Sequence, residues 1–355
     1  MRSGCPTVCL PEAMTAHLGV DAGNTKTLAM LCGPSGELLG LGRSRCGDTY
    51  GAPGEDAAVD EVFAAIDAAL TAAGRTRDAV ASAAFRLAGV DWPADSDFWA
   101  ATLTQRWPQL QVRSIRNDGY AAIRCGAPQG AGVALAAGTA AAIAARGADG
   151  RTWDMGWWGQ HPMGALGLVS EALRAVYLAD LGLGPPTALT ERVLAHYRRA
   201  SLAELCEWFT RRHDRASSAA QAGAAPVVTA AAVDGDPVAA EIVDEQGRRL
   251  ALYGEVAARR VGLLERGDPV PVVLTGSVLT TADSPVAAAL RGHLQRLLPA
   301  AAPRVATLPP VAGAALDAIA EAGRPVDETT LQRLSADFAR MASDERPTAA
   351  DQAER

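Results

Sequence analysis

The sequence predicts an α/β protein in which one domain type occurs twice. An apolar run ends in a turn with Gly and Thr at residues 21–27, a second run follows, and a Gly turn at 33–36 leads into a third run. The same order recurs around residues 137–139 and 147–150. Apolar residues at helical spacing lie between these groups of runs. A repeat this long does not fit a solenoid, so it indicates a duplicated domain.

Each element follows from its local pattern. The first three runs are short and joined by Gly-containing turns, which predicts an antiparallel meander. Residues 56–73 carry apolar side chains at helical spacing and end at Gly74, which predicts a helix with a Gly stop. The expected strands are 17–21, 26–32, 37–42, 80–87, 110–115, 132–136, 140–145, 271–275 and 304–308. The expected helices are 56–73, 96–106, 117–123, 166–181, 189–199, 202–211, 237–265, 284–298, 311–322 and 329–341.

These elements give a domain organisation. Residues 1–15 would be a disordered leader. They lack the apolar segment of a secretory signal, so we do not expect them to be one. Residues 16–116 would form the N-terminal domain and 117–310 a C-terminal domain with helical insertions. A helix at 311–324 would return to the N-terminal domain. Residues 325–355 would form a helical or disordered tail.

The charge, the apolar runs and the cysteines of the chain argue against several classes of function. The chain has 355 residues, with 33 Lys plus Arg against 40 Asp plus Glu and a formal net charge of −7. This acidic balance, without a basic stripe, argues against a nucleic-acid partner. No run is long and apolar enough to cross a membrane. The six cysteines form no C-x-x-C pair, which favours reduced thiols in a cytoplasmic protein.

The two Gly-Thr turns are candidates for binding an anion. Asp21 lies at the end of a strand and is followed by small residues, so backbone N–H groups can face a phosphate while the carboxylate holds the water shell of a metal. An ordinary hairpin turn has the same appearance. The second turn, Gly138-Thr139, changes the interpretation, because one such turn in each domain could hold a triphosphate from both sides. Lys26, the only lysine of the chain, lies in the first turn.

Six motifs, in chain order, carry a more specific resemblance. They are Asp21-Ala22-Gly23-Asn24-Thr25-Lys26-Thr27, Leu87-Ala88-Gly89, Asn117-Asp118, Ala137-Gly138-Thr139, Leu274-Thr275-Gly276-Ser277 and Pro310-Val311-Ala312-Gly313-Ala314-Ala315. They resemble the motifs of the actin-like ATPase and sugar-kinase superfamily, and within it the N-acetylglucosamine kinase and BadF/BadG/BcrA/BcrD-type ATPase family. The resemblance covers residues 16–322. It implies two actin-like (ribonuclease H-like) domains with duplicated β-β-β-α-β-α cores and a nucleotide cleft between them.

The resemblance also implies a function and its residues. The protein would be a homodimeric, ATP-dependent kinase of an amino sugar such as N-acetylglucosamine or glucosamine. Asp118 would be the general base for the sugar hydroxyl, although Asn117-Asp118 taken alone favours a helix cap. Asp21 would hold Mg²⁺ through water. ATP would contact Gly23, Asn24, Thr25, Lys26, Gly138, Thr139, Gly276, Ser277 and Gly313. The sugar would contact Asp48, Gly89, Asn117 and His161.

Three departures from the family pattern keep alternatives open. The second turn continues with Ala140-Ala141 where the family has Gly-Ser, and residues 158–167 lack both carboxylates of the family's G-D-E-G-S segment. Asp48 replaces an Asn, and could pair with the ammonium group of a free amino sugar or aminocyclitol. The altered segments would also fit a regulatory ATPase or an inactive kinase homologue. The dehydratase-activator branch is disfavoured, because Ala136-Ala137 occupy the place of its cluster-binding cysteine.

Overall fold

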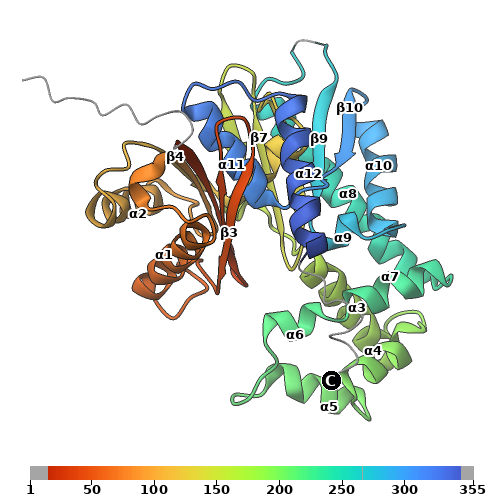
Figure 1. Cartoon of the computed structure of the whole chain (residues 1–355). Helices are drawn as coiled ribbons and strands as arrows, with labels where there is room; N and C mark the ends of the chain where they lie inside the picture. The colour runs from red at the N-terminus through yellow and green to blue at the C-terminus, as the bar shows by residue number, and fades with distance from the viewer. Residues whose placement is uncertain (1–14, 266, 345–355) are drawn as a thin grey trace, which may run out of the picture. The chain divides into compact units, whose positions relative to one another are not determined.

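The computed structural model describes residues 15–265 and 267–344 (Figure 1). Contacts divide the chain into two units, Met1–Gly130 with Thr307–Arg355, and Ala131–Ala306. This division places residues 117–130 in the first unit, whereas the sequence-based boundary was expected after residue 116. Of the expected leader, residues 1–14 lie outside the described part. None of the helices in the described part is long and apolar enough to span a membrane.

The first unit contains a five-stranded mixed sheet in the order β3-β2-β1-β4-β5. Its strands are β1 (Ala16–Ala22), β2 (Thr27–Cys32), β3 (Leu38–Ser44), β4 (Val80–Leu87) and β5 (Val112–Asn117). The first three strands pair antiparallel, which confirms the expected meander, and β4 and β5 extend the sheet parallel to β1. The carboxyl ends of β1, β4 and β5 therefore meet at one edge.

Helices cover both faces of this sheet. They are α1 (Glu55–Ala72), η2 (Arg77–Ala79), α2 (Pro93–Arg106), η3 (Asp118–Cys125), α11 (Pro310–Glu321) and α12 (Glu328–Asp344). Figure 1 shows α1 and α2 on one face, where their apolar side chains form one core with β1 and β4, and α11 on the other face. The approach of α1 to β3 depends on Gly42, since a Cβ there would lie 2.1 Å from the Ala65 carbonyl oxygen.

The second unit repeats the topology of the first. Its sheet has the order β10-β9-β6-β7-β8, so β6 holds the place of β1. The strands are β6 (Gly132–Ala137), β7 (Ala141–Arg146), β8 (Thr152–Asp154), β9 (Val270–Thr275) and β10 (Ala301–Val305). Strands β6, β7 and β8 pair antiparallel, and β9 and β10 extend the sheet parallel to β6. The duplicated domain predicted from the sequence is confirmed.

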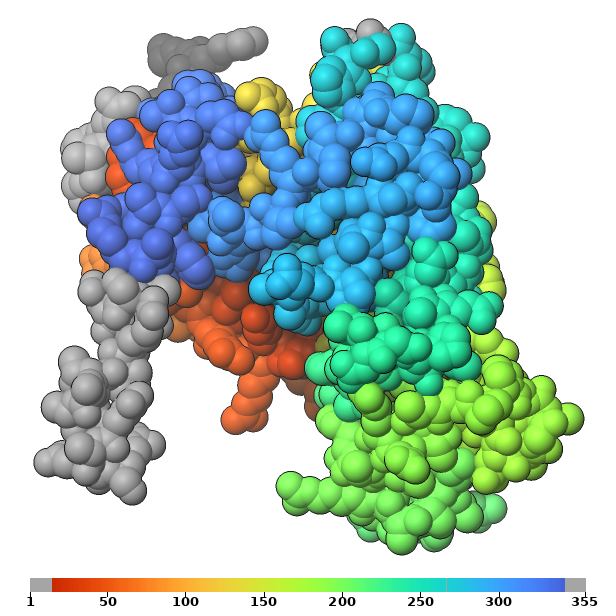
Figure 2. Space-filling view, turned by 90° about the vertical axis from the view of Figure 1, so that its right-hand side faces the viewer, coloured from red at the N-terminus to blue at the C-terminus, as the bar shows by residue number. Residues whose placement is uncertain are grey.

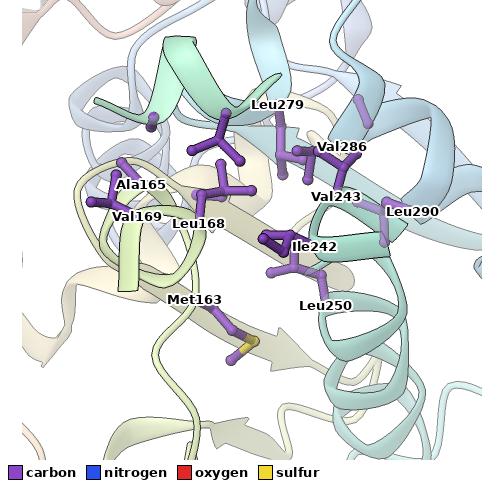
Figure 3. Close-up of a cluster of buried hydrophobic side chains, with 14 of the residues drawn as sticks. Met163, Ala165, Leu168, Val169, Ile242, Val243, Leu250, Leu279, Val286 and Leu290 are labelled. Carbon is purple, nitrogen blue, oxygen red and sulfur yellow. The ribbon is translucent and has the colours of Figure 1, made fainter. Parts of the chain in front are cut away.

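The second unit is enlarged by helices between β8 and β9. The helical elements of the unit are η4 (Gly156–Trp158), α3 (Ala165–Asp180), α4 (Leu189–Tyr197), α5 (Leu202–Thr210), α6 (Ser218–Ala222), α7 (Ala225–Val233), α8 (Pro237–Arg260), α9 (Ser277–Thr280) and α10 (Pro285–Leu297). Figure 3 shows apolar side chains of α3, α8 and α10 packed together in the core of the unit. In Figure 2 the green segments, which include α4 to α6, project from the rest of this unit.

Three expectations about these elements were wrong in detail. The strand expected at 304–308 lies at Ala301–Val305, where it pairs with β9. Helix α7 was not expected, because its Ala- and Val-rich sequence has no polar face to mark a helical period. The helix expected at 117–123 is a 3₁₀ helix over Asp118–Cys125.

A buried ion-pair network fixes α11 in the first unit. Asp317 of α11 accepts from Arg86 Nη2 of β4 at 2.6 Å and from Arg124 Nε of η3 at 2.7 Å. The side chains of Arg86 and Asp317 are 0% and 1% exposed. Arg86 also donates to Ser114 and, at 3.3 Å, to Glu321. One carboxylate thus joins a helix, a strand and the 3₁₀ helix that begins at Asp118.

We expect Asp317→Ala to lower the free energy of unfolding by about 3–5 kcal/mol, because it leaves two guanidinium groups without their buried carboxylate. Asp60→Ala is the matched control. It removes an exposed partner of Arg106 and should cost less than about 1 kcal/mol. Urea denaturation of the two variants measures both values. Equal losses would contradict the role given to Asp317.

Candidate active site

Polar residues gather where the strands of the first sheet end. Asp21 lies near the end of β1, Asn117 ends β5, and Asp118 follows it. Asp91 comes shortly after β4, and Asp48 lies in the loop after β3. The negative charges of Asp21, Asp91 and Asp48 all act on Asp118. The structure thus brings together carboxylates from four separate segments of one unit.

Hydrogen bonds hold two of these carboxylates beside their neighbours. Asn117 Nδ2 donates to Asp91 Oδ1 at 2.9 Å, while Asn117 Oδ1 accepts from the Gly119 N–H at 2.9 Å. Asn117 therefore caps η3, as its residue type allows, and also orients Asp91. Asn24 Nδ2 donates to Asp48 Oδ2 at 3.2 Å. Asp48 is buried, with 7% of its surface exposed.

The clustering changes the acidity of two carboxyls. Burial, followed by the charges of Asp21, Asp91 and Asp48, raises the pKa of Asp118 to about 7. Burial also raises the pKa of Asp21 to about 7, against the opposing charge of Lys26. A carboxyl with a pKa near neutrality can take up and release a proton at physiological pH, which is the property required of a general base.

The two Gly-Thr turns are tight hairpins, each inside its own unit. In the first, the Gly23 N–H donates to the Lys26 carbonyl at 3.0 Å, and Asn24, Thr25 and Lys26 are exposed. In the second, the Gly138 N–H donates to the Ala140 carbonyl at 3.0 Å. Both turns present small or polar residues to solvent, as a phosphate-binding loop requires.

The second turn is supported by the start of α3. The Ala165 N–H donates to the Gly138 carbonyl and the Leu166 N–H to the Thr139 carbonyl, each at 2.9 Å. Gly276 lies against the same region, with a φ of 86° and a hypothetical Cβ 2.4 Å from the Ala137 carbonyl group. Only Gly fits there. Ser277, which follows, is exposed at the start of α9.

Gly313 and Gly89, two of the residues predicted to bind a ligand, pack against other parts of the protein, and His161, a third, is exposed. A Cβ on Gly313 would lie 1.9 Å from the Ala121 carbonyl oxygen, so this Gly is required for the packing of α11 on η3. Gly89 has a φ of 77° and lies beneath Asp48. His161 is exposed before α3, and within the described part of the chain its ring forms no hydrogen bond.

The sequence analysis missed Asp91 and Tyr50. Asp91 is bonded to Asn117 and contributes to the acidity of Asp118. The Tyr50 N–H donates to Asp48 Oδ1 at 2.9 Å. Asp91 could have been predicted, because it is a carboxylate that follows Gly89 by two residues, just after a parallel strand. Tyr50 gave no signal, because the partner of its phenol, Asp95, lies 45 positions away.

The raised pKa of Asp118 has a consequence for stability. In the unfolded chain the pKa of this carboxyl is near its ordinary value of 3.8, but in the folded protein it is about 7. Between these values the folded state binds more protons, so its contribution to stability falls as pH rises through this window. We expect Asp118→Asn to raise Tm by about 2–4 °C at pH 8 and by clearly less at pH 5. Thermal unfolding at both pH values measures this, and the same shift at both would contradict the raised pKa.

Several solved structures share the fold. A proposed N-acetylglucosamine kinase from Chromobacterium violaceum is 24% identical, with a TM-score of 0.63 over 86% of this chain and 99% of that one. A second, from Porphyromonas gingivalis, is 18% identical, with a TM-score of 0.57 over 84% and 97%. A ROK family glucokinase from Streptomyces griseus, in complex with glucose and AMPPNP, is 20% identical, with a TM-score of 0.52 over 85% and 98%.

These similarities confirm the two-domain actin-like fold. A comparison with curated proteins gave no match. The sequence profile of the BadF/BadG/BcrA/BcrD ATPase family matches residues 18–318, which is most of the chain. The protein therefore belongs to the BadF/BadG/BcrA/BcrD ATPase family.

Proposed function

We propose that the protein is an ATP-dependent kinase that phosphorylates a hydroxyl group of an amino sugar or a related sugar. The observation that carries this proposal is Asp118, a carboxyl with a pKa of about 7 at the edge where β1, β4 and β5 end. Family membership supports the use of ATP, and the fold shared with sugar kinases supports a sugar as the acceptor.

Asp118 acts as the general base in this proposal. A sugar hydroxyl is a poor nucleophile, so a carboxylate accepts its proton as the new bond to phosphorus forms. Asn117 fixes the start of η3 and thereby the position of Asp118. In this proposal Asn117, Gly89 and His161 also contact the acceptor sugar.

The two exposed turns bind the phosphates of ATP. In the first turn Asn24 and Thr25 supply backbone N–H groups, Thr25 a hydroxyl and Lys26 a positive charge, while Gly23 lets the backbone come close to the phosphates. In the second turn Gly138 likewise allows a close approach, and Thr139 supplies an N–H and a hydroxyl. Gly276 and Ser277 lie along the adenosine, and Gly313 lies at the start of α11.

A Mg²⁺ ion would neutralise phosphate charge during transfer. Within the described residues no three His, Cys, Asp or Glu side chains converge as a ligand set. Asp21 nevertheless fits an ion held through water, since a partly buried carboxyl with a raised pKa gains from a nearby cation. In this proposal Asp21 orients the water shell of the ion and the phosphates complete it.

Asp48 sets the preference for the acceptor. Its carboxylate is buried, and the groups that donate to it, the Asn24 amide and the Tyr50 N–H, are uncharged. An acceptor with a free ammonium group would pair with this charge. A free amino sugar or aminocyclitol is therefore favoured over an acetamido sugar. We also infer a homodimer from the family resemblance, and a cytoplasmic location from the cysteines, which form no C-x-x-C pair.

A nucleotide-binding regulatory ATPase or an inactive kinase homologue is the second candidate. Ala140 and Ala141 favour it, because they remove a hydroxyl donor from the second turn. Binding of ATP without phosphorylation of any hydroxyl acceptor would support this candidate.

We expect Asp118→Asn to lower the rate of acceptor-dependent ADP release by about 10²–10⁴-fold, because the amide cannot accept the proton. An ADP-release assay over N-acetylglucosamine, glucosamine, other hexoses and aminocyclitols measures the rate. The control Asp60→Asn, at an exposed position of α1, should match the wild type. Equal rates for the wild type and Asp118→Asn would show that Asp118 is not the base.

We expect Asp48→Asn to raise the KM for glucosamine about tenfold, which corresponds to about 1.4 kcal/mol of lost ammonium pairing. The KM for N-acetylglucosamine should change less, because that sugar carries no such charge. Steady-state kinetics with both sugars measure the ratio. A wild-type enzyme that prefers N-acetylglucosamine to glucosamine would contradict this role of Asp48.

A further inference from the structure

Tyr50 connects two acidic loops of the first unit. Its backbone N–H donates to Asp48 Oδ1 at 2.9 Å, and its phenol hydroxyl donates to Asp95 Oδ1 at 3.2 Å. One residue thus gives a hydrogen bond to a carboxylate in its own loop and to a carboxylate in the first turn of α2. We propose that Tyr50 and Asp95 are a positioning pair that holds the loop of Asp48 against the loop of Asp91, and this proposal rests on the function proposed above.

Asp95 is well placed to receive the bond. Its second oxygen, Oδ2, accepts the N–H groups of Asp91 at 3.1 Å and Trp92 at 2.8 Å. The bond from the Trp92 N–H is the carboxylate half of a capping box at the start of α2, and the Asp95 N–H donates in return to the Trp92 carbonyl. The carboxylate of Asp95 is therefore anchored to the backbone of the segment that carries Asp91, and the phenol of Tyr50 attaches to this anchored group.

Asp48 and Tyr50 lie so close to residue 89 that only a Gly fits at this position. This residue has a φ of 77°, and a Cβ there would lie 2.8 Å from Tyr50 Cδ2 and 2.7 Å from Asp48 Oδ1. The Gly therefore serves two needs at once, a left-handed backbone and the approach of the two loops. Its place in the predicted sugar-site motif has a packing explanation.

The carboxylates around position 50 explain why a neutral Tyr is suited to this position. Partial burial and the hydrogen bond to Asp95 raise the pKa of the Tyr50 phenol, and the charges of Asp95, Asp91 and Asp48 add to this, so these charges lie within reach of it. Within the described residues neither Asp48 nor Asp95 forms an ion pair. Like charges on the two loops repel each other. A neutral residue with two donors satisfies both carboxylates without cancelling the charge.

The bridge completes a hydrogen-bonded path across the site. The path begins at Asn24 in the first turn and passes through Asp48, Tyr50 and Asp95 to the backbone of Asp91. The Asp91 side chain then accepts from Asn117, which caps the 3₁₀ helix of Asp118. The phosphate turn and the proposed base are joined through Tyr50, so removal of the phenol should loosen the acceptor site more than the ATP site.

The first test is amide hydrogen exchange of the free, full-length protein. Tyr50→Phe should speed exchange at Asp91 and Trp92, although the substitution lies in the other loop. The control Tyr197→Phe removes a phenol that donates to the Gln221 carbonyl in the second unit, and should leave these amides unchanged. Unchanged exchange of the 89–95 segment in Tyr50→Phe would overturn the proposal, whether or not the protein is a kinase.

The second test separates positioning from simple stability. Tyr50→Phe should raise the KM for the acceptor about five- to tenfold, with kcat and the KM for ATP changed less than twofold. Asp95→Asn should stay within about threefold of wild type, because its amide can donate to the phenol oxygen and keep the bridge. Equal changes in both KM values and in kcat would overturn the positioning role.

The two proposals fail in different ways. If no acceptor supports ADP release but Tyr50→Phe still speeds exchange at Asp91, the kinase is disproved and the bridge stands. If the wild type is an active kinase and Tyr50→Phe changes neither exchange nor the KM of the acceptor, the bridge is disproved and the kinase stands.

Discussion

The geometry of the first unit depends on the placement of Asp317 between Arg86 and Arg124. Buried charges lose their hydration, and a buried ion pair often contributes little net stability. Here the ion-pair network contributes by fixing the position of α11. The carboxylate fastens α11 to the end of η3, and Gly313 lets α11 approach η3 at Ala121. Because Asp118 begins η3, this buried network fixes the element on which the proposed base lies.

The other end of η3 is held by a different kind of contact. There Asn117 caps the 3₁₀ helix and bonds to Asp91, and the donors to Asp48 are likewise uncharged. Arginines therefore secure the buried end of η3, whereas amides, a phenol and backbone N–H groups secure the other. This division retains negative charge around Asp118, which adds to the effect of burial in raising its pKa. The cost is lower stability at alkaline pH, which is typical of a functional site.

The sequence predicted most of this fold because its signals are local. Gly turns and apolar runs mark the meander twice, and both five-stranded sheets follow that pattern. Contacts between distant segments were not predictable in this way. Tyr50 meets Asp95 across 45 positions, and nothing near either residue indicates the other. Gly313 matched a nucleotide motif, yet the packing on Ala121 explains why Gly is needed there.

The altered second turn bears on whether the protein is active. A Gly-to-Ala change is costly where the backbone has a positive φ. Among the described non-Gly residues the positive φ values occur at Arg198, Asp214 and Asp283, so Ala140 is not strained. The turn also keeps the support of α3 through the carbonyls of Gly138 and Thr139. These bonds use acceptors and leave the exposed hydroxyl of Thr139 available to a phosphate. The substitution therefore removes one donor from a turn whose backbone is intact, which favours an active kinase over an inactive homologue.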